Sequence, residues 1–258
     1  MSDKDTYANM QKTKYEGKAQ RWRVHGDHRN AVVGGFNEHN NWKDYELLHK
    51  GVDTENLVML DFGCGPGRNV VKYWEDFKRV DGVDIGSLNI ENAKKWMEYN
   101  NISSDRSNLY VNNGLDLSEI KSETYDVIMS TIAIQHICSH SIRYGLFEEF
   151  YRVLKPGGYI TIQMGYWGDN PDHPLSPCKM CRLKGEPGSC THPTAVDYYE
   201  NYYDAPNTNG AHDTKVSSPS ELENDLIKIQ FKNFEFTIAK TGPWDRRHPK
   251  WIFFRAWK

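Results

Sequence analysis

Short apolar runs alternate along the chain with stretches whose apolar residues recur at helical spacing. The runs predict buried strands, and they lie at 57–60, immediately before Asp84, and at 109–111, 125–130 and 159–164. The stretches between them predict three helices: one that begins at Val70, one at 88–99 and one at 142–154. Ser87 is the predicted N-cap of the second. Apolar runs at 234–238 and 251–254 predict a closing antiparallel pair. This order predicts an α/β fold with a doubly wound, seven-stranded, mostly parallel sheet, and ligands bind such sheets at the carboxyl ends of the strands.

A glycine-rich loop follows the first strand, in the segment LDFGCGPGRN at 60–69. Glycines at this point let the backbone turn sharply against a ligand, with no Cβ in the way. Asp84 ends the second strand about 20 residues after the first glycine, where a carboxylate can accept hydrogen bonds from ribose hydroxyls. The loop and Asp84 together predict a nucleotide pocket.

The glycine spacing distinguishes among nucleotides. A dinucleotide fingerprint has G-x-G-x-x-G around a pyrophosphate, whereas here the third glycine, Gly67, comes one residue early and Arg68 takes the expected place. Asp61 lies at the strand end, where a carboxylate repels a pyrophosphate and attracts a cation. S-Adenosylmethionine (SAM) fits this pattern, since it has a ribose, an ammonium group and a sulfonium but no phosphate. A nicotinamide-dependent dehydrogenase is disfavoured.

The loop resembles motif I of the class I SAM-dependent methyltransferases, and the resemblance extends over roughly residues 57–164. Residues 125–130, YDVIMS, look like the family's fourth strand, and Lys155-Pro156-Gly157-Gly158 looks like its turn into the fifth. The resemblance implies methyl transfer from SAM to an O, N or C atom of a small-molecule acceptor. Methylation of RNA or protein, or SAM binding without catalysis on the same fold, are the alternatives.

The resemblance also assigns roles to residues at matching positions. Asp61 is expected near the methionine ammonium, Asp84 on the ribose diol and Ile85 on the adenine. Asn113 stands where relatives often have Asp, and it can read the adenine edge or serve as a turn residue. Ser130 is expected beside the transferring methyl. The cofactor-binding residues implied are Asp61, Gly63, Cys64, Gly65, Gly67, Asp84, Ile85, Asn113, Gly114, Leu115 and Ser130, with Cys64 interpreted as a small packing residue of the loop.

Methyl transfer is an in-line displacement at an activated sulfonium carbon, so the protein mainly aligns and desolvates the reactants. A general base is needed only when the acceptor oxygen or nitrogen starts protonated. His136, just past the fourth strand, is the candidate base. The alternative is a histidine that orients its loop, as in many relatives.

Two segments outside the core motifs are expected to close over the acceptor. Residues 1–50 are predicted to form an N-terminal helical cap, and 51–258 a methyltransferase-like domain. Within that domain, 166–220 is interpreted as a substrate-lid insert, because it is too long for a plain connection and rich in tyrosine.

The insert contains a cluster of metal-ligating residue types. Cys178-x-x-Cys181 is followed by Cys190-x-His192, and zinc takes four such ligands tetrahedrally. A structural zinc ion would order a loop that lacks a core of its own. The alternative is a set of free surface thiols.

Composition narrows the choice of partners and compartment. The formal net charge of −3 over 258 residues gives no global electrostatic case for nucleic acid. Five cysteines are an odd number, which disfavours a disulfide framework. No apolar run approaches membrane-spanning length, and the N-terminus is polar, so we expect a cytoplasmic protein with no membrane segment. The sequence does not decide the oligomeric state.

Overall fold

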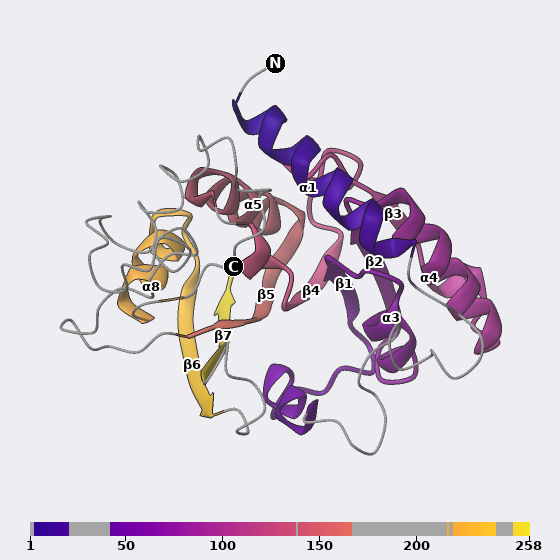
Figure 1. Ribbon diagram of the computed structural model, residues 1–258. Coiled ribbons are helices and arrows are strands. Elements are labelled where there is room, and N and C mark those ends of the chain that lie inside the picture. Colours follow the sequence, from indigo (N-terminus) through magenta and orange to yellow (C-terminus); the bar gives the residue numbers. More distant parts are fainter. Residues whose placement is uncertain (1–2, 21–41, 138, 167–215, 217–218, 241–249) are drawn as a thin grey trace.

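The computed structural model describes residues 3–20, 42–137, 139–166, 216, 219–240 and 250–258. Within them, seven strands form one sheet in the order β3-β2-β1-β4-β5-β7-β6 (Figure 1). The strands are β1 (Val58–Phe62), β2 (Arg79–Asp84), β3 (Leu109–Val111), β4 (Tyr125–Thr131), β5 (Leu154–Gly165), β6 (Lys232–Lys240) and β7 (Lys250–Trp257). The first five pair in parallel, and β7 runs antiparallel to both β5 and β6. The predicted doubly wound, mostly parallel sheet is confirmed.

Helices cover both faces of this sheet. The α-helices are α1 (Asp3–Ala19), α3 (Arg68–Lys72), α4 (Ser87–Tyr99), α5 (His140–Val153) and α8 (Pro219–Lys228), and the 3-10 helices are η1 (Trp42–Leu48), η2 (Ser104–Arg106) and η3 (Ile134–His136). On β4, Val127 and Met129 enter the apolar core formed with η1, α3 and α4, whereas Ile128 enters the core formed with α5 and α8. Because strand side chains alternate between faces, burial on both sides explains the unbroken apolar runs.

The N-terminus of α4 differs from the sequence prediction. Gly86 occupies the N-cap position, so the predicted Ser87 N-cap is wrong. The carboxylate of Glu16, on α1, accepts hydrogen bonds from Ser87 N at 2.6 Å, Ser87 Oγ at 2.8 Å and Leu88 N at 3.2 Å. These amides have no partner inside the helix, and an anion at a helix N-terminus also interacts favourably with the helix dipole. A residue distant in sequence therefore caps α4.

Helix α1 is anchored at its other end as well. It lies alongside α4 (Figure 1). The Tyr7 hydroxyl and Gln11 Nε2 donate to the carbonyl oxygen of His136, at 3.3 and 3.1 Å. Gln11 Nε2 also donates to the Tyr7 hydroxyl at 2.7 Å. Helix α1 therefore reaches from the start of α4 to η3, across the carboxyl ends of the strands.

Candidate active site

A cavity of about 350 Å³ lies at the carboxyl ends of β1, β2 and β4. Its walls come from α1, the glycine loop with the start of α3, the end of β2, the residues after β3, the end of β4, and η3. The sequence-predicted residues that line it are Gly63, Cys64, Gly65, Asp84, Ile85, Gly114 and His136. The structure therefore brings residues from separate motifs together at the edge of the sheet where the strand order indicated a ligand.

The glycine loop wraps around this cavity in left-handed backbone conformations. Gly63 has φ +73°, and a Cβ added to it would lie 2.3 Å from the Cβ of Ala133. Gly65 has φ +53°, and no neighbouring atom lies within 4 Å of its Cβ position. Position 63 thus requires glycine both because a Cβ would overlap Ala133 and because φ is positive. At Gly65 only the positive φ favours glycine, and the space beside its Cα is open. Gly67 packs against Ala93 of α4, outside the cavity lining.

Asp84 is held rigidly at the end of β2. Its Oδ1 accepts hydrogen bonds from Gly86 N at 2.8 Å and Asn89 Nδ2 at 2.9 Å, and its Oδ2 accepts one from Gly65 N at 2.9 Å. Burial raises the pKa of this carboxyl, while the donors from Asn89, Gly86 and Gly65 counteract the rise. A carboxylate has about four lone-pair positions, so roughly one is left for a ligand hydroxyl. This is less than the two hydroxyl contacts that the sequence suggested.

Asp61 lies beneath the loop, 1% exposed and outside the cavity lining. Its Oδ1 accepts a hydrogen bond from Asn69 Nδ2 at 3.3 Å, whereas its Oδ2 accepts none from the described residues. Burial raises the pKa of Asp61 to about 7, against the lowering effects of Asn69 and Arg68. Asn69 and Arg68 both line the cavity. A buried carboxyl with one unpartnered oxygen is therefore close to the residues that face a ligand.

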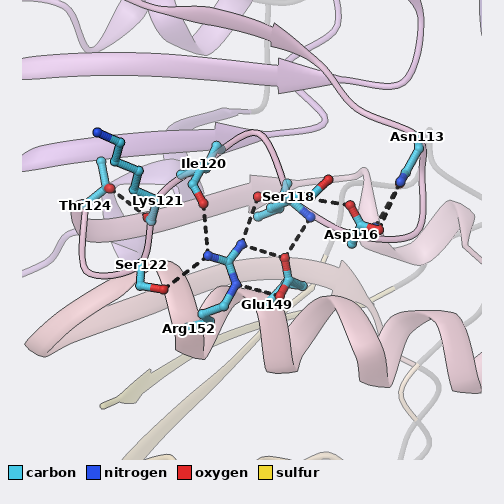
Figure 2. A network of polar contacts seen from close by, with 10 residues as sticks. Asn113, Asp116, Ser118, Ile120, Lys121, Ser122, Thr124, Glu149 and Arg152 are labelled. Atoms are coloured by element: carbon cyan, nitrogen blue, oxygen red, sulfur yellow. Dashed lines mark hydrogen bonds and ion pairs between the residues drawn. The ribbon is translucent and has the colours of Figure 1, made fainter.

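Two of the residues predicted from the segment after β3 lie outside the cavity lining. Asn113 does not line the cavity: its Oδ1 accepts from Leu115 N at 2.7 Å. It also bonds Asp116 (Figure 2), with Oδ1 accepting from Asp116 N at 3.0 Å and Nδ2 donating to Asp116 Oδ2 at 3.0 Å. It is a turn residue, the alternative left open by the sequence. Leu115 also lies outside the lining. Asn112 lines the cavity instead, and its Oδ1 has no partner among the described residues.

Ser130 lies near the end of β4, as predicted, but outside the cavity lining. It is fully buried, and its hydroxyl donates to the carbonyl of Phe62 at 3.0 Å. Strand β4 continues one residue further than predicted, so Thr131, Ile132 and Ala133 face the cavity. Cys64 lines the cavity with a buried thiol whose pKa is raised by burial, which keeps it protonated and unreactive.

His136 lies at the end of η3 and lines the cavity. Its ring lies 6.0 Å, centroid to centroid, from that of Tyr15 on α1. Its backbone carbonyl, as described above, holds α1. Both roles suggested by the sequence, catalytic base and organiser of a loop, are therefore compatible with its position.

Sequence reasoning missed one wall of the cavity. Tyr7, Gln11, Tyr15 and Lys18 of α1 all line it. They are spaced four, four and three residues apart, which places them on one face of a helix. That spacing can be read from the sequence, but nothing local indicates that this face packs across the strand ends.

The predicted zinc ligands Cys178, Cys181, Cys190 and His192 lie outside the described residues, as does most of the predicted lid insert. Among the residues that the structure does describe, no group of three or more His, Cys, Asp or Glu is arranged to hold a metal ion. Nor does any helix in this part of the chain have the length and apolarity needed to cross a membrane.

Comparison with known proteins supports the interpretation of the fold. Residues 59–158 match the family model described as a methyltransferase domain. Phosphoethanolamine N-methyltransferase 2 of Haemonchus contortus, solved with phosphomonomethylethanolamine and S-adenosylhomocysteine, superposes with a TM-score of 0.60 at 19% identity, over 87% of this chain and 53% of that one. A SAM-dependent methyltransferase of Methanosarcina mazei superposes with a TM-score of 0.54 at 21% identity, over 80% of this chain and 93% of that one.

The relatives found by sequence similarity are also methyltransferases. The sterol 24-C-methyltransferase of Aspergillus fumigatus is 28% identical over 138 residues, which are 50% of this chain and 35% of the relative. The corresponding enzyme of Candida albicans is 28% identical over 122 residues, which are 46% of this chain and 31% of the relative. The chain thus spans about a third of the length of these curated relatives. The matched methyltransferase domain, the sheet order and the glycine loop agree, and the chain has the class I SAM-dependent methyltransferase fold.

Proposed function

We propose that this protein transfers a methyl group from SAM to an O, N or C atom of a small-molecule acceptor. The observation that carries the proposal is the cavity itself: the glycine loop and the rigidly held carboxylate of Asp84 line a largely apolar space, and the buried carboxyl of Asp61 lies beneath the loop. When bound, SAM supplies a methyl group already activated by a positively charged sulfur.

The residues around the cavity fit this cofactor. Asp61 Oδ2 is buried without a partner among the described residues, which is unfavourable unless a cation or donor approaches it. Asp84 keeps about one lone-pair position for a ribose hydroxyl. The open space beside Gly65 lets a ligand lie against the backbone. The residues therefore suit a ligand that has a ribose and a positive charge but no phosphate.

The chain's own contribution to the reaction is alignment and exclusion of water. Apolar side chains, among them Phe62, Val83, Ile132 and Ile137, line the cavity beside the polar anchors. Such walls strengthen electrostatic contacts and keep the reacting groups in line. His136 would remove a proton only from an acceptor that starts protonated.

A small molecule is the acceptor class that these observations favour. Helix α1 crosses the carboxyl ends of the strands and supplies one wall of the cavity, which favours a ligand of limited size. Both reported sequence relatives are named for a sterol, and one solved neighbour holds phosphomonomethylethanolamine, so related domains are associated with small molecules of very different polarity. The net charge of −3 offers little attraction for RNA.

Two finer points stay predictions from the sequence. A structural zinc ion at Cys178, Cys181, Cys190 and His192 is supported by their spacing alone. The division into a cap at 1–50 and a domain at 51–258, with 166–220 as a lid, is supported by composition and by the position of α1 over the cavity.

Calorimetric titration with SAM and, separately, NADH tests the proposal on the wild type, Asp84→Asn and Asp81→Asn. Asp81 is the matched control, because it is another fully buried carboxylate of β2 but does not line the cavity. We expect saturable SAM binding that is weakened by Asp84→Asn and kept by Asp81→Asn. A preference for NADH, or no SAM binding, would contradict the proposal. SAM binding without turnover in an acceptor screen would favour a non-catalytic SAM-binding protein.

A further inference from the structure

The segment between β3 and β4 forms one end of the cavity but has little regular structure. Asn112 and Gly114 line the cavity, and a Cβ added to Gly114 would lie 2.5 Å from Cδ1 of Ile85, another lining residue. Gly114 also has φ +81°. Gly114 therefore packs closely against Ile85, while Asn112 is bonded to β2 through its amide, which donates to the carbonyl of Asp84 at 3.1 Å.

Inside the segment, a short series of side-chain to backbone hydrogen bonds sets the turn (Figure 2). Asn113 caps the amides of Leu115 and Asp116, as described above. Asp116 Oδ1 then accepts from Ser118 N at 3.1 Å. These contacts shape the turn, but none of them ties it to the rest of the protein.

Backbone hydrogen bonds tie the two ends of the segment to β2 and α5. Its middle is connected to α5 by two side chains, Glu149 and Arg152. Glu149 Oε2 accepts from Leu117 N at 2.9 Å, and Arg152 Nη2 donates to Leu117 O at 2.8 Å. Arg152 Nη1 donates to the carbonyl of Ile120 at 2.9 Å and to Ser122 Oγ at 3.3 Å (Figure 2). Both backbone groups of Leu117, whose side chain is fully buried, are thus satisfied by α5. These bonds replace the strand pairing that the segment lacks.

The two side chains also fix each other. Arg152 Nε donates to Glu149 Oε1 and Arg152 Nη2 donates to Glu149 Oε2, both at 2.7 Å, in a bidentate ion pair. Hydrogen bonds from Arg152 lower the pKa of Glu149, and Glu149 raises that of Arg152, so both are charged at neutral pH. Neither residue lines the cavity.

We propose that Glu149 and Arg152 are positioning residues for the cofactor: from outside the cavity, they hold the wall containing Asn112 and Gly114 against Ile85, and thereby set the affinity for the nucleoside part of SAM. This inference rests on the proposed function. The pair touches no ligand, and it acts through the backbone of Leu117. Lysine at position 152 would keep the positive charge but lose the planar guanidinium that makes paired hydrogen bonds. It would therefore hold the wall less firmly than arginine does.

Calorimetric titration with SAM and with 5′-methylthioadenosine, which has the nucleoside but no amino-acid end, tests the inference. The variants are Arg152→Met, Arg152→Lys and Glu149→Gln. We expect Arg152→Met to weaken both ligands by about tenfold, because disruption of a supporting network changes affinity to that order. Arg152→Lys and Glu149→Gln should lose less, and equal losses for the two ligands would locate the effect at the nucleoside.

Arg106→Met is the matched control for lost stability. Arg106 donates to the carbonyls of Trp74, Phe77 and Lys78 at 3.1 to 3.3 Å, but contacts no part of the wall. It should lower the melting temperature and leave SAM affinity unchanged. The positioning role is wrong if Arg152→Met weakens SAM binding no more than Arg106→Met does. It is also wrong if Arg152→Lys and Glu149→Gln change stability but not SAM affinity. In both cases the proposed function stands. If the wild type binds no SAM, the proposed function fails, and the inference fails with it.

Discussion

Replacing Asp61 with asparagine should stabilise the ligand-free protein and at the same time weaken its binding of SAM. The carboxyl is 1% exposed, and burial raises its pKa from an ordinary value of 3.8 to about 7. Asparagine has nearly the same shape, and its carbonyl can still accept the hydrogen bond from Asn69 Nδ2. The substitution therefore removes the buried charge and little else.

The size of the effect follows from the pKa. The unfolded chain ionises Asp61 near pH 3.8 and the folded chain near pH 7, so the folded state binds more protons between these values and stability falls as pH rises through this window. The raised pKa costs the folded state about 4 kcal/mol at pH 8, where Asp61 is ionised, and about 2 kcal/mol at pH 5.5, where folding requires it to be protonated. The stability gained by Asp61→Asn should therefore grow by about 2 kcal/mol between pH 5.5 and pH 8.

Urea unfolding of wild type and variant at both pH values measures this difference. Asp81→Asn is the control: Asp81 accepts hydrogen bonds from Tyr125 Oη and Asn108 N, both at 2.8 Å, so its replacement should destabilise the protein instead. Calorimetry completes the experiment, because a cationic ligand should favour the ionised form of Asp61. Binding of SAM near pH 7 should release protons in the wild type and fewer in Asp61→Asn.

A gain in stability that is the same at both pH values would refute this account of Asp61. So would unchanged SAM affinity, since loss of a charged partner should weaken binding about tenfold or more. The first result would mean that burial does not raise the pKa of Asp61, and the second that its carboxyl has no role toward a cationic ligand.

Three further predictions concern other parts of the chain. Gly63→Ala should destabilise by about 3 kcal/mol in urea unfolding, because its Cβ would overlap that of Ala133 at positive φ, whereas Gly17→Ala, at an open helical position, should be neutral or slightly stabilising. His136→Ala should lower turnover more than SAM affinity once an acceptor is found, and unchanged turnover would remove His136 from the mechanism. Elemental analysis of protein purified without chelator should find one zinc per chain, lost on changing Cys178 and Cys181 to serine, and absence of zinc in the unchanged protein would reject the metal site.

Much of the site could be predicted from sequence because its features are local. Asp84 ends a strand, and Gly63 and Gly65 belong to the loop that follows one. Parallel strands end at one edge of the sheet, so consecutive motifs meet there whatever the rest of each loop does. The apolar runs predicted the strands for the same reason, since burial on both faces depends on the strand itself.

The tertiary structure decided what depends on contacts between distant segments. Whether Asn112 or Asn113 faces the cavity depends on where β3 ends and on the turn that follows. The cap on α4 comes from Glu16, 71 residues before Ser87, and no local pattern contains it. The same holds for the α1 wall and for the Glu149–Arg152 pair. A sequence shows which side chains can make such contacts, but packing of the whole chain selects the partners.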